Sequence, residues 1–178
     1  MPACKAACDR IEASNLPMEV RAALVSSVVT PKAAYACAAS PPSKRDVAGL
    51  KSACTRAIWG QANPWRAAEV VHGLLCKGHI TAPDLAVQYS TITTTNRILR
   101  RHPELVPVLL ENVRLRAANP APFGGPAKAL TKSIHAIGAQ LQQDGTVQLP
   151  AVEQGQSIAL NSPDLGRFQH LVREGQRV

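Results

Sequence analysis

The sequence predicts a mainly α-helical protein. Alanine supplies 28 of the 178 residues while aromatic residues make up 3%, so the core has to be built from small and aliphatic side chains. Such side chains suit closely packed helices, whereas the strands of a β-sandwich draw on aromatic and β-branched residues. Apolar residues make up 46% and charged residues 18%, a composition typical of a packed globular chain. Prolines and glycines recur at intervals that divide the chain into helix-sized segments.

Two apolar segments open the chain. Residues 3–15 are expected to form a short amphipathic helix. Residues 18–40 are expected to form a longer one, which Pro31 bends or restarts because its ring removes a backbone donor. Cys4 and Cys8 lie one helical turn apart in the first segment, where we expect them at the surface near a frayed end.

The two helices that follow carry start and stop signals. Ser43 and Asp46 have the spacing of a capping box, and Gly60 ends the helix that they begin. Asn63 followed by Pro64 gives a second start signal, an N-cap with proline at the first helical position. The buried stripe of this second helix is predicted at Ala67, Val70, Val71, Leu74 and Leu75.

Similar signals mark the next two helices and a linker. Thr81 with Asp84 is another capping box, for a helix that ends near Arg101. Pro103 opens a further apolar helix, which ends where residues 119–126 begin. That stretch holds three prolines and two glycines, so it is interpreted as a linker.

The C-terminal part is predicted to combine helix and strand. A helix is expected to end at Asp144 and Gly145. Residues 146–149 and 157–160 are expected to pair as a short hairpin that packs against the helices. Residues 162–175 are expected to contain a last helix. The spacing that predicts the first of these helices is carried by Leu130, Ile134, Ile137 and Leu141.

These segments define a predicted domain organisation. Residues 1–118 form a basic helical domain, residues 119–126 the Pro/Gly linker, and residues 127–178 the C-terminal part. The formal net charge is +8 and the pI about 9.7. Residues 1–118 carry fifteen basic against eight acidic side chains. Such an excess attracts polyanions, with nucleic acid the first candidate and an anionic membrane surface the second. A charge that serves only solubility is the alternative.

Cysteine usage and hydropathy predict a soluble, intracellular protein. The cysteine count of five is odd, and Cys37, Cys54 and Cys76 fall among apolar residues, where free cysteine behaves as a small hydrophobe. No stretch approaches 18 uncharged apolar residues, and the N-terminus lacks the apolar region of a secretory signal. We therefore expect a cytoplasmic or nuclear location and no membrane partner.

The sequence contains no motif of an established catalytic chemistry. A phosphate-binding glycine loop ending in Gly-Lys-Ser/Thr, a Gly-x-Ser-x-Gly elbow and a His-Glu-x-x-His pair are all lacking, and no catalytic residue or cofactor is expected. The one metal candidate is the group His72, Cys76 and His79. Its spacing lets three ligands approach a zinc ion, but the fourth ligand is missing locally. Core and capping roles are the alternative interpretation of these three residues.

Basic residues gather in two places along the sequence. Arg97 and Arg101 are one helical turn apart, so both can face a phosphate backbone. Trp59, Trp65 and Tyr89 lie near the basic residues in sequence and would either stack on bases or anchor the core. The predicted nucleic-acid-binding residues are Lys44, Arg45, Lys51, Arg56, Arg66, Arg97, Arg100 and Arg101.

Four stretches carry a resemblance to a known family. Residues 9–17 and 20–35 are similar to the pattern "lp…r..lv.s.vlpk..Yg", with Ala36 in place of its glycine. Residues 50–60 are similar to the pattern "lr.ai.raiwG". Residues 66–83 are similar to the pattern "R..Evv..ll.kgH..dP", except that Asp84 follows Pro83 instead of preceding it. The chain therefore resembles the thumb region that follows the catalytic palm in reverse transcriptases of non-LTR, LINE-like retrotransposons. The stretch similar to the family's connection between thumb and ribonuclease H domain consists of Gly125, Pro126, Leu130, Ile137, Gly138 and residues 168–174.

The resemblance implies a helical, thumb-like bundle that grips the phosphates of a template-primer, with a polymerase palm domain as its partner. The family's active site is a Tyr/Phe-x-Asp-Asp turn, whereas this chain has Tyr35-Ala36-Cys37, Tyr89-Ser90-Thr91 and no Asp-Asp. We expect a non-catalytic fragment that binds an RNA or DNA backbone and is inactive alone as an RNA-directed DNA polymerase. A helical interaction or scaffold protein, or a decayed reading frame, is the alternative, and a small zinc-binding protein is the remote one.

Overall fold

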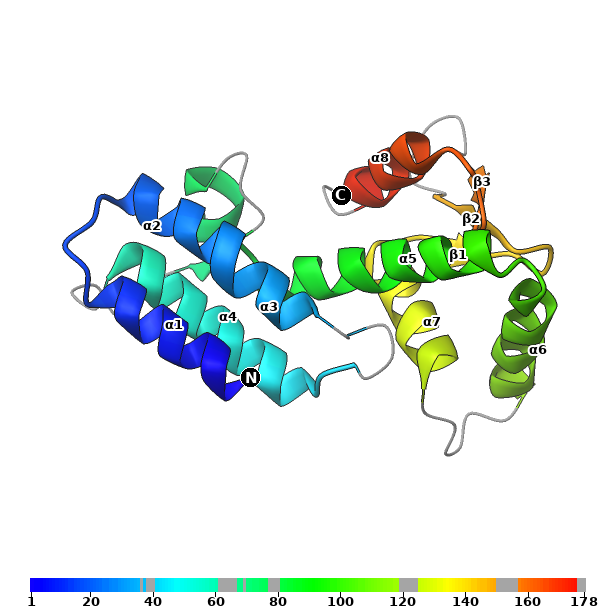
Figure 1. Ribbon diagram of the computed structural model, residues 1–178, viewed down its shortest axis with the longest axis horizontal. Helices are drawn as coiled ribbons and strands as arrows, with labels where there is room; N and C mark the ends of the chain where they lie inside the picture. Colours follow the sequence, from blue (N-terminus) through cyan, green and yellow to red (C-terminus); the bar gives the residue numbers. More distant parts are fainter. Residues whose placement is uncertain are drawn as a thin grey trace. The chain divides into compact units, whose positions relative to one another are not determined.

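The computed structural model describes residues 1–35, 37, 41–60, 67–68, 70–76, 81–118, 125–149 and 157–175 (Figure 1). Within these residues the protein is mainly α-helical, as predicted, with one small sheet. The chain divides into two compact units. Unit 1 comprises residues 1–35 and 42–87, and unit 2 comprises residues 36–41 and 88–178.

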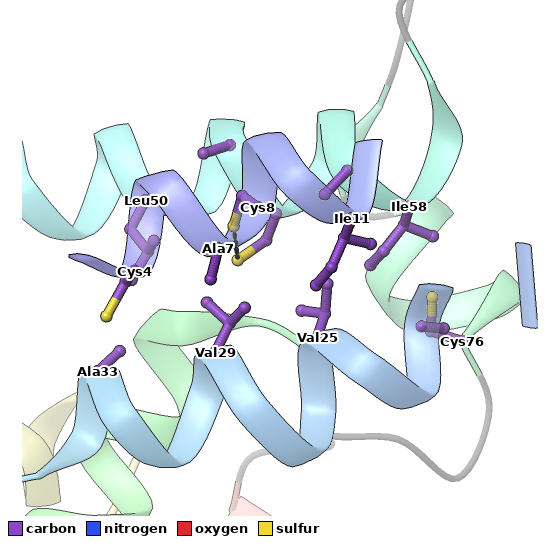
Figure 2. Close-up of a cluster of buried hydrophobic side chains, with 14 of the residues drawn as sticks. Cys4, Ala7, Cys8, Ile11, Val25, Val29, Ala33, Leu50, Ile58 and Cys76 are labelled. Atoms are coloured by element: carbon purple, nitrogen blue, oxygen red, sulfur yellow. Dashed lines mark hydrogen bonds between the residues drawn. The ribbon is translucent and has the colours of Figure 1, made fainter. Parts of the chain in front are cut away.

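Unit 1 is built from helices alone in its described residues. Its helical segments are α1 (Pro2–Glu12), α2 (Met18–Leu24), η1 (Val25–Val29), α3 (Thr30–Ala34), α4 (Lys44–Trp59) and η2 (Val70–Leu75), and it includes the first turn of α5 (Pro83–Arg101). Helices α1 and α4 pack against each other, and the α2–η1–α3 segment packs against both. One apolar cluster fills the space between them, with Val25, Val29, Leu50 and Ile58 at its centre (Figure 2).

Pro31 restarts a helix, as the sequence predicts. Proline has no backbone N–H to donate to the carbonyl four residues earlier. Just before it the chain forms the π-helical segment η1, in which the Thr30 hydroxyl donates to the Val25 carbonyl at 3.0 Å. The α-helical segment α3 then begins at Thr30 with proline in its first turn. The extra residue in the π-helical turn accommodates the missing hydrogen bond without ending the helix.

The start and end of α4 follow the capping prediction. The Ser43 hydroxyl accepts a hydrogen bond from the Asp46 backbone N–H at 3.1 Å and donates one to the Asp46 carboxylate at 2.6 Å. The helix ends at Gly60, whose φ of +90° lies in the left-handed region that favours glycine.

The stripe predicted after Asn63 is wrong. The described helical segment here is η2, in which the Cys76 N–H donates to the Val71 carbonyl, five residues back. This wider turn separates residues that an α-helix would place on one face. Of the predicted stripe, Val71 is buried, Ala67, Val70 and Leu75 are exposed, and the side chain of Leu74 lies outside the described residues.

Unit 2 combines helices with a small antiparallel sheet. Its elements are the remainder of α5, then α6 (Leu105–Ala118), α7 (Pro126–Ala136), β1 (Gln140–Leu141), β2 (Thr146–Gln148), β3 (Ser157–Ala159) and α8 (Leu165–Gly175). The strand order is β1-β2-β3. Its core is a second apolar cluster, in which Leu130, Ile134 and Phe168 are fully buried.

The predicted hairpin is confirmed, but the helix before it is shorter than expected. Val147 of β2 pairs with Ile158 of β3. Helix α7 ends at Ala136, and Gly138, at a φ of +70°, turns the chain into a third strand that the sequence analysis missed. Leu141 therefore lies in β1 and pairs with Val147, although its spacing is helical.

The structure divides the chain at a different place from the predicted domains. The boundary between the units falls within α5, after Val87, and α5 and α6 contribute to the same core as the C-terminal part. Helix α6 also packs against α7 across the predicted linker 119–126, of which residues 119–124 lie outside the described residues. None of the described helices combines the length and apolar character needed to cross a bilayer.

Candidate nucleic-acid interface

Two of the predicted phosphate-binding residues are engaged in ion pairs within unit 1. Lys51 lies 3.1 Å from the Asp84 carboxylate at the start of α5. Arg56 donates through Nε to Glu12 at 2.7 Å and through Nη2 to Asp9 at 2.8 Å, so it joins α4 to α1. The two carboxylates, Glu12 foremost, raise the pKa of Arg56 above its ordinary value, and its charge is held by the protein's own acids.

The first turn of α4 carries two basic side chains that stay exposed. Lys44 and Arg45 follow the N-cap Ser43, and neither forms an ion pair within the described residues. Asp46 is exposed beside them, which reduces the local excess of positive charge. The fifth predicted residue of unit 1, Arg66, lies outside the described residues.

A more concentrated group of positive charge lies at the C-terminal end of α5, in unit 2. Arg97, Arg100 and Arg101, called the arginine cluster below, are all exposed. In the part of the chain that the structure describes, none of the three is paired with an acid. Their spacing places Arg97 beside both Arg100 and Arg101 on the helix surface. Positive side chains at a helix C-terminus also interact favourably with its dipole.

The helix below the arginine cluster is fixed by a buried side chain. Asn96 is fully buried, and its Nδ2 donates to the carbonyls of Leu160 at 2.8 Å and Ser162 at 3.3 Å. Ile92 and Leu99 are buried in the core of unit 2 along the same helix. The cluster is therefore presented on a helix that is anchored to the C-terminal part of its unit.

One acidic residue follows the cluster closely. His102 Nδ1 lies 3.1 Å from the Glu104 carboxylate just before α6, and both side chains are exposed. Hydrogen bonds from the Glu104 backbone N–H and from His102 hold the pKa of Glu104 below its ordinary value. Glu104 is therefore ionised, and its negative charge follows the arginine cluster closely in the sequence.

The described aromatic residues near the basic groups differ in exposure. Tyr89 is half-buried against the core of unit 2, and its ring lies 5.6 Å from the guanidinium carbon of Arg173, a cation–π contact. Trp59 ends α4 and is 39% exposed, so part of its ring is available for stacking. Trp65 lies outside the described residues.

The zinc candidate has one member with both ring nitrogens already occupied. His72 Nε2 lies 2.9 Å from the Thr55 hydroxyl, and Nδ1 lies 2.8 Å from the Thr81 hydroxyl. Thr55 donates its own proton to the Lys51 carbonyl, so it accepts from Nε2–H. Cys76 is buried, His79 lies outside the described residues, and no three described His, Cys, Asp or Glu side chains converge as metal ligands.

The structure corrects the expectation for the first two cysteines. Cys4 and Cys8 are buried instead of lying at the surface, and Cys37, Cys54 and Cys76 are buried as predicted. The missed signal was the spacing of Cys4, Ala7, Cys8 and Ile11, which together form the buried face of α1.

Positive charge is shared equally between the two units. Each unit has ten Lys and Arg residues against six Asp and Glu residues, because the boundary within α5 assigns the arginine cluster to unit 2. The eight predicted binding residues therefore belong to two separate structural groups. Of these groups, the arginine cluster is the denser in unpaired, exposed charge within the described residues.

Comparison with known proteins finds no family model, no curated protein and no solved structure that matches this chain.

Proposed function

We propose that this protein binds the phosphate backbone of RNA or DNA through the arginine cluster of unit 2. The observation that carries the proposal is the exposure of Arg97, Arg100 and Arg101 on one anchored helix end, without an acidic partner among the described residues. Guanidinium groups donate to phosphate oxygens in a bidentate geometry, and such contacts do not depend on base identity. The net charge of +8 favours the approach of a polyanion to the whole chain.

The proposal gives the predicted residues of unit 1 different roles. Lys44 and Arg45 remain secondary phosphate contacts, since they are exposed and unpaired within the described residues. Lys51 and Arg56 stabilise unit 1 through Asp84, Asp9 and Glu12 and contribute little to binding. A single nucleic-acid duplex does not have to contact both groups for binding to occur.

The test is the salt dependence of binding. Each phosphate contact releases counterions, so replacing Arg97, Arg100 and Arg101 by alanine should lower the slope of log affinity against log salt by about 3. The loss should be similar for duplexes of unrelated sequence, as measured by fluorescence anisotropy with labelled oligonucleotides at several salt concentrations.

A matched control removes the same charge elsewhere in unit 2. Arg114, Lys132 and Arg167 are exposed on α6, α7 and α8, and alanine at all three should change the slope far less than alanine in the cluster. Equal effects of the two triple variants would show that net charge alone matters and would contradict the assigned interface.

An exposed apolar face on α6 favours a second candidate function, binding of another protein. Leu105, Val108 and Leu115 are 40%, 56% and 54% exposed, which is unusual for three large apolar side chains on one helix. A partner helix or sheet would cover such a face. If the cluster variants leave nucleic-acid binding unchanged, this function is the one that the described surface supports.

The likeness to the thumb of a retroelement reverse transcriptase remains a proposal. The helical architecture of unit 1 and the three patterns within residues 9–83 support it. A reading frame upstream of Met1 that encodes an Asp-Asp-bearing palm would establish the relationship, and an unrelated or closed frame would remove its main support.

A further inference from the structure

Two thiols from different helices meet in the core of unit 1. The sulfur atoms of Cys8 on α1 and Cys54 on α4 lie 3.7 Å apart, although the residues are 46 positions apart in sequence. Both side chains are fully buried. Figure 2 shows the contact as the dashed line at Cys8, between the two helices.

Small side chains let the two helices approach closely at this point. Ala7 on α1 and Ala53 and Ala57 on α4 are buried in the same cluster. No bulky group separates the sulfur atoms, and a disulfide needs a sulfur–sulfur distance of about 2.05 Å. Rotation of the two side chains with a slight shift of α1 would close this gap.

The environment of the pair distinguishes its two members. The pKa of Cys8 is lowered, because its thiolate accepts a hydrogen bond from the Cys54 thiol and also feels the charge of Arg56, while burial and Asp9 act in the opposite direction. The pKa of Cys54 is raised, because its proton is held in that hydrogen bond and the site is buried. These directions favour Cys8 over Cys54 as the thiolate of the pair.

We propose that Cys8 and Cys54 form an oxidisable dithiol, which a hydroperoxide converts into a disulfide that links α1 to α4. In the first step the Cys8 thiolate attacks one oxygen of hydrogen peroxide, the O–O bond breaks, and the departing hydroxide takes a proton to become water. In the second step the Cys54 sulfur attacks the Cys8 sulfenic acid, and the hydroxyl group leaves with the Cys54 proton as a second water. Two thiols are oxidised and one peroxide is reduced to two waters.

Peroxide reaches the pair when α1 opens locally. The N-terminal residue Met1 provides no side-chain cap for α1, and the buried face of the helix consists of two cysteines, one alanine and one isoleucine. Such a face buries little apolar area, so we expect α1 to open more readily than the helices in the middle of the unit. The oxidation should accordingly be slower than that of an exposed thiol.

The test is peptide mapping of the folded full chain after treatment with hydrogen peroxide. Trypsin separates all five cysteines onto different peptides, with Cys8 on residues 6–10, Cys54 on residues 52–56 and Cys4 on residues 1–5. We expect the intact protein to lose the mass of two hydrogen atoms and peptides 6–10 and 52–56 to be recovered joined. Dithiothreitol should release them.

Two cysteine variants make the result specific. Cys54→Ala should abolish the linked peptide and leave Cys8 as a sulfenic acid that dimedone traps. Cys76→Ala, which removes another buried thiol of the same core, should leave the link unchanged. The proposal is overturned if another pair is joined, or if peptides 6–10 and 52–56 stay separate at a peroxide concentration that oxidises both cysteines in the urea-denatured chain.

Discussion

At the scale of single residues, Asn96 shows how a polar side chain fixes an element. Its Nδ2 donates hydrogen bonds to the carbonyls of Leu160 and Ser162, and its Oδ1 has no partner among the described residues. A fully buried amide that bonds two main-chain carbonyls links α5 to the segment that follows β3. This link holds the helix end on which the arginine cluster sits.

Asn96→Ala should destabilise the protein by about 2 kcal/mol, because both carbonyls lose a donor in a buried site. Urea denaturation followed by circular dichroism measures the change. Arg100→Ala, an exposed change on the same helix, should stay within about 0.5 kcal/mol of the wild type. An Asn96→Ala protein that is as stable as the Arg100→Ala protein would show that this link is dispensable.

Sequence reasoning at this scale found residues whose role is local. Ser43 and Asp46 were identified because a capping box spans four positions. The partners of Asn96, Arg56 and Cys8 lie 44 to 66 positions away, so no local pattern indicates them. Lys51 and Arg56 were accordingly predicted to bind phosphates, although both are paired with acidic residues of unit 1.

At the scale of elements, α1 is held to α4 by a combination of small apolar side chains and one arginine. Glu12 is only 11% exposed, while Asp9 is 61% exposed, so the pair with Glu12 is the better shielded from solvent. Removing the guanidinium would leave the Glu12 carboxylate partly buried without its cation. Removal of one partner of a shielded ion pair destabilises a protein because the remaining charge is left uncompensated.

Arg56→Ala should therefore lower the stability of unit 1 by about 1–3 kcal/mol. Arg10→Ala is the matched control, since Arg10 is exposed on α1 and should cost little. Arg56→Lys should fall between, because one ammonium group cannot reproduce the fork that contacts both acids. Denaturation midpoints in urea compare the three proteins, and identical midpoints for Arg56→Ala and Arg10→Ala would contradict this role.

Element types were predicted better than element ends. Every described α-helix overlaps a predicted helical segment, because apolar spacing and proline or glycine signals agree there. The ends differ, since α1 begins at Pro2 and α7 begins at Pro126, which had been assigned to the linker. The spacing of Ile137 and Leu141 continues that of α7, but the backbone turns at Gly138. A helical repeat and the start of a strand can place apolar residues at the same intervals over one turn, so β1 was missed.

At the scale of the whole molecule, the described residues form two apolar cores. The clusters around Leu50 and Ile58 in unit 1 and around Ile134 and Phe168 in unit 2 share no described residue. The sequence pointed to a boundary at residues 119–126 because composition changes there. Which segments share a core depends on long-range packing, which composition does not encode.

Ile134→Ala should cost about 2–4 kcal/mol, since it opens a cavity in a fully buried site. Hydrogen exchange should show lost amide protection in α7, the sheet and α8, with α1 and α4 retained. Ile58→Ala in unit 1 is the matched control. It should lower amide protection in α1 and α4 and leave that of α7, the sheet and α8 unchanged. Equal loss of protection across both units from either variant would mean that the two cores unfold as one.

The contact between α1 and α4 also has a consequence for synthesis on the ribosome. Helix α1 ends at Glu12, but α4 begins only at Lys44. Helix α1 therefore leaves the exit tunnel well before α4, the helix that packs against it, has been synthesised. A helix of about three turns with so little apolar area will not stay folded alone in water. The thiols of Cys4 and Cys8 therefore remain open to reagents and chaperones until the later helix emerges and docks.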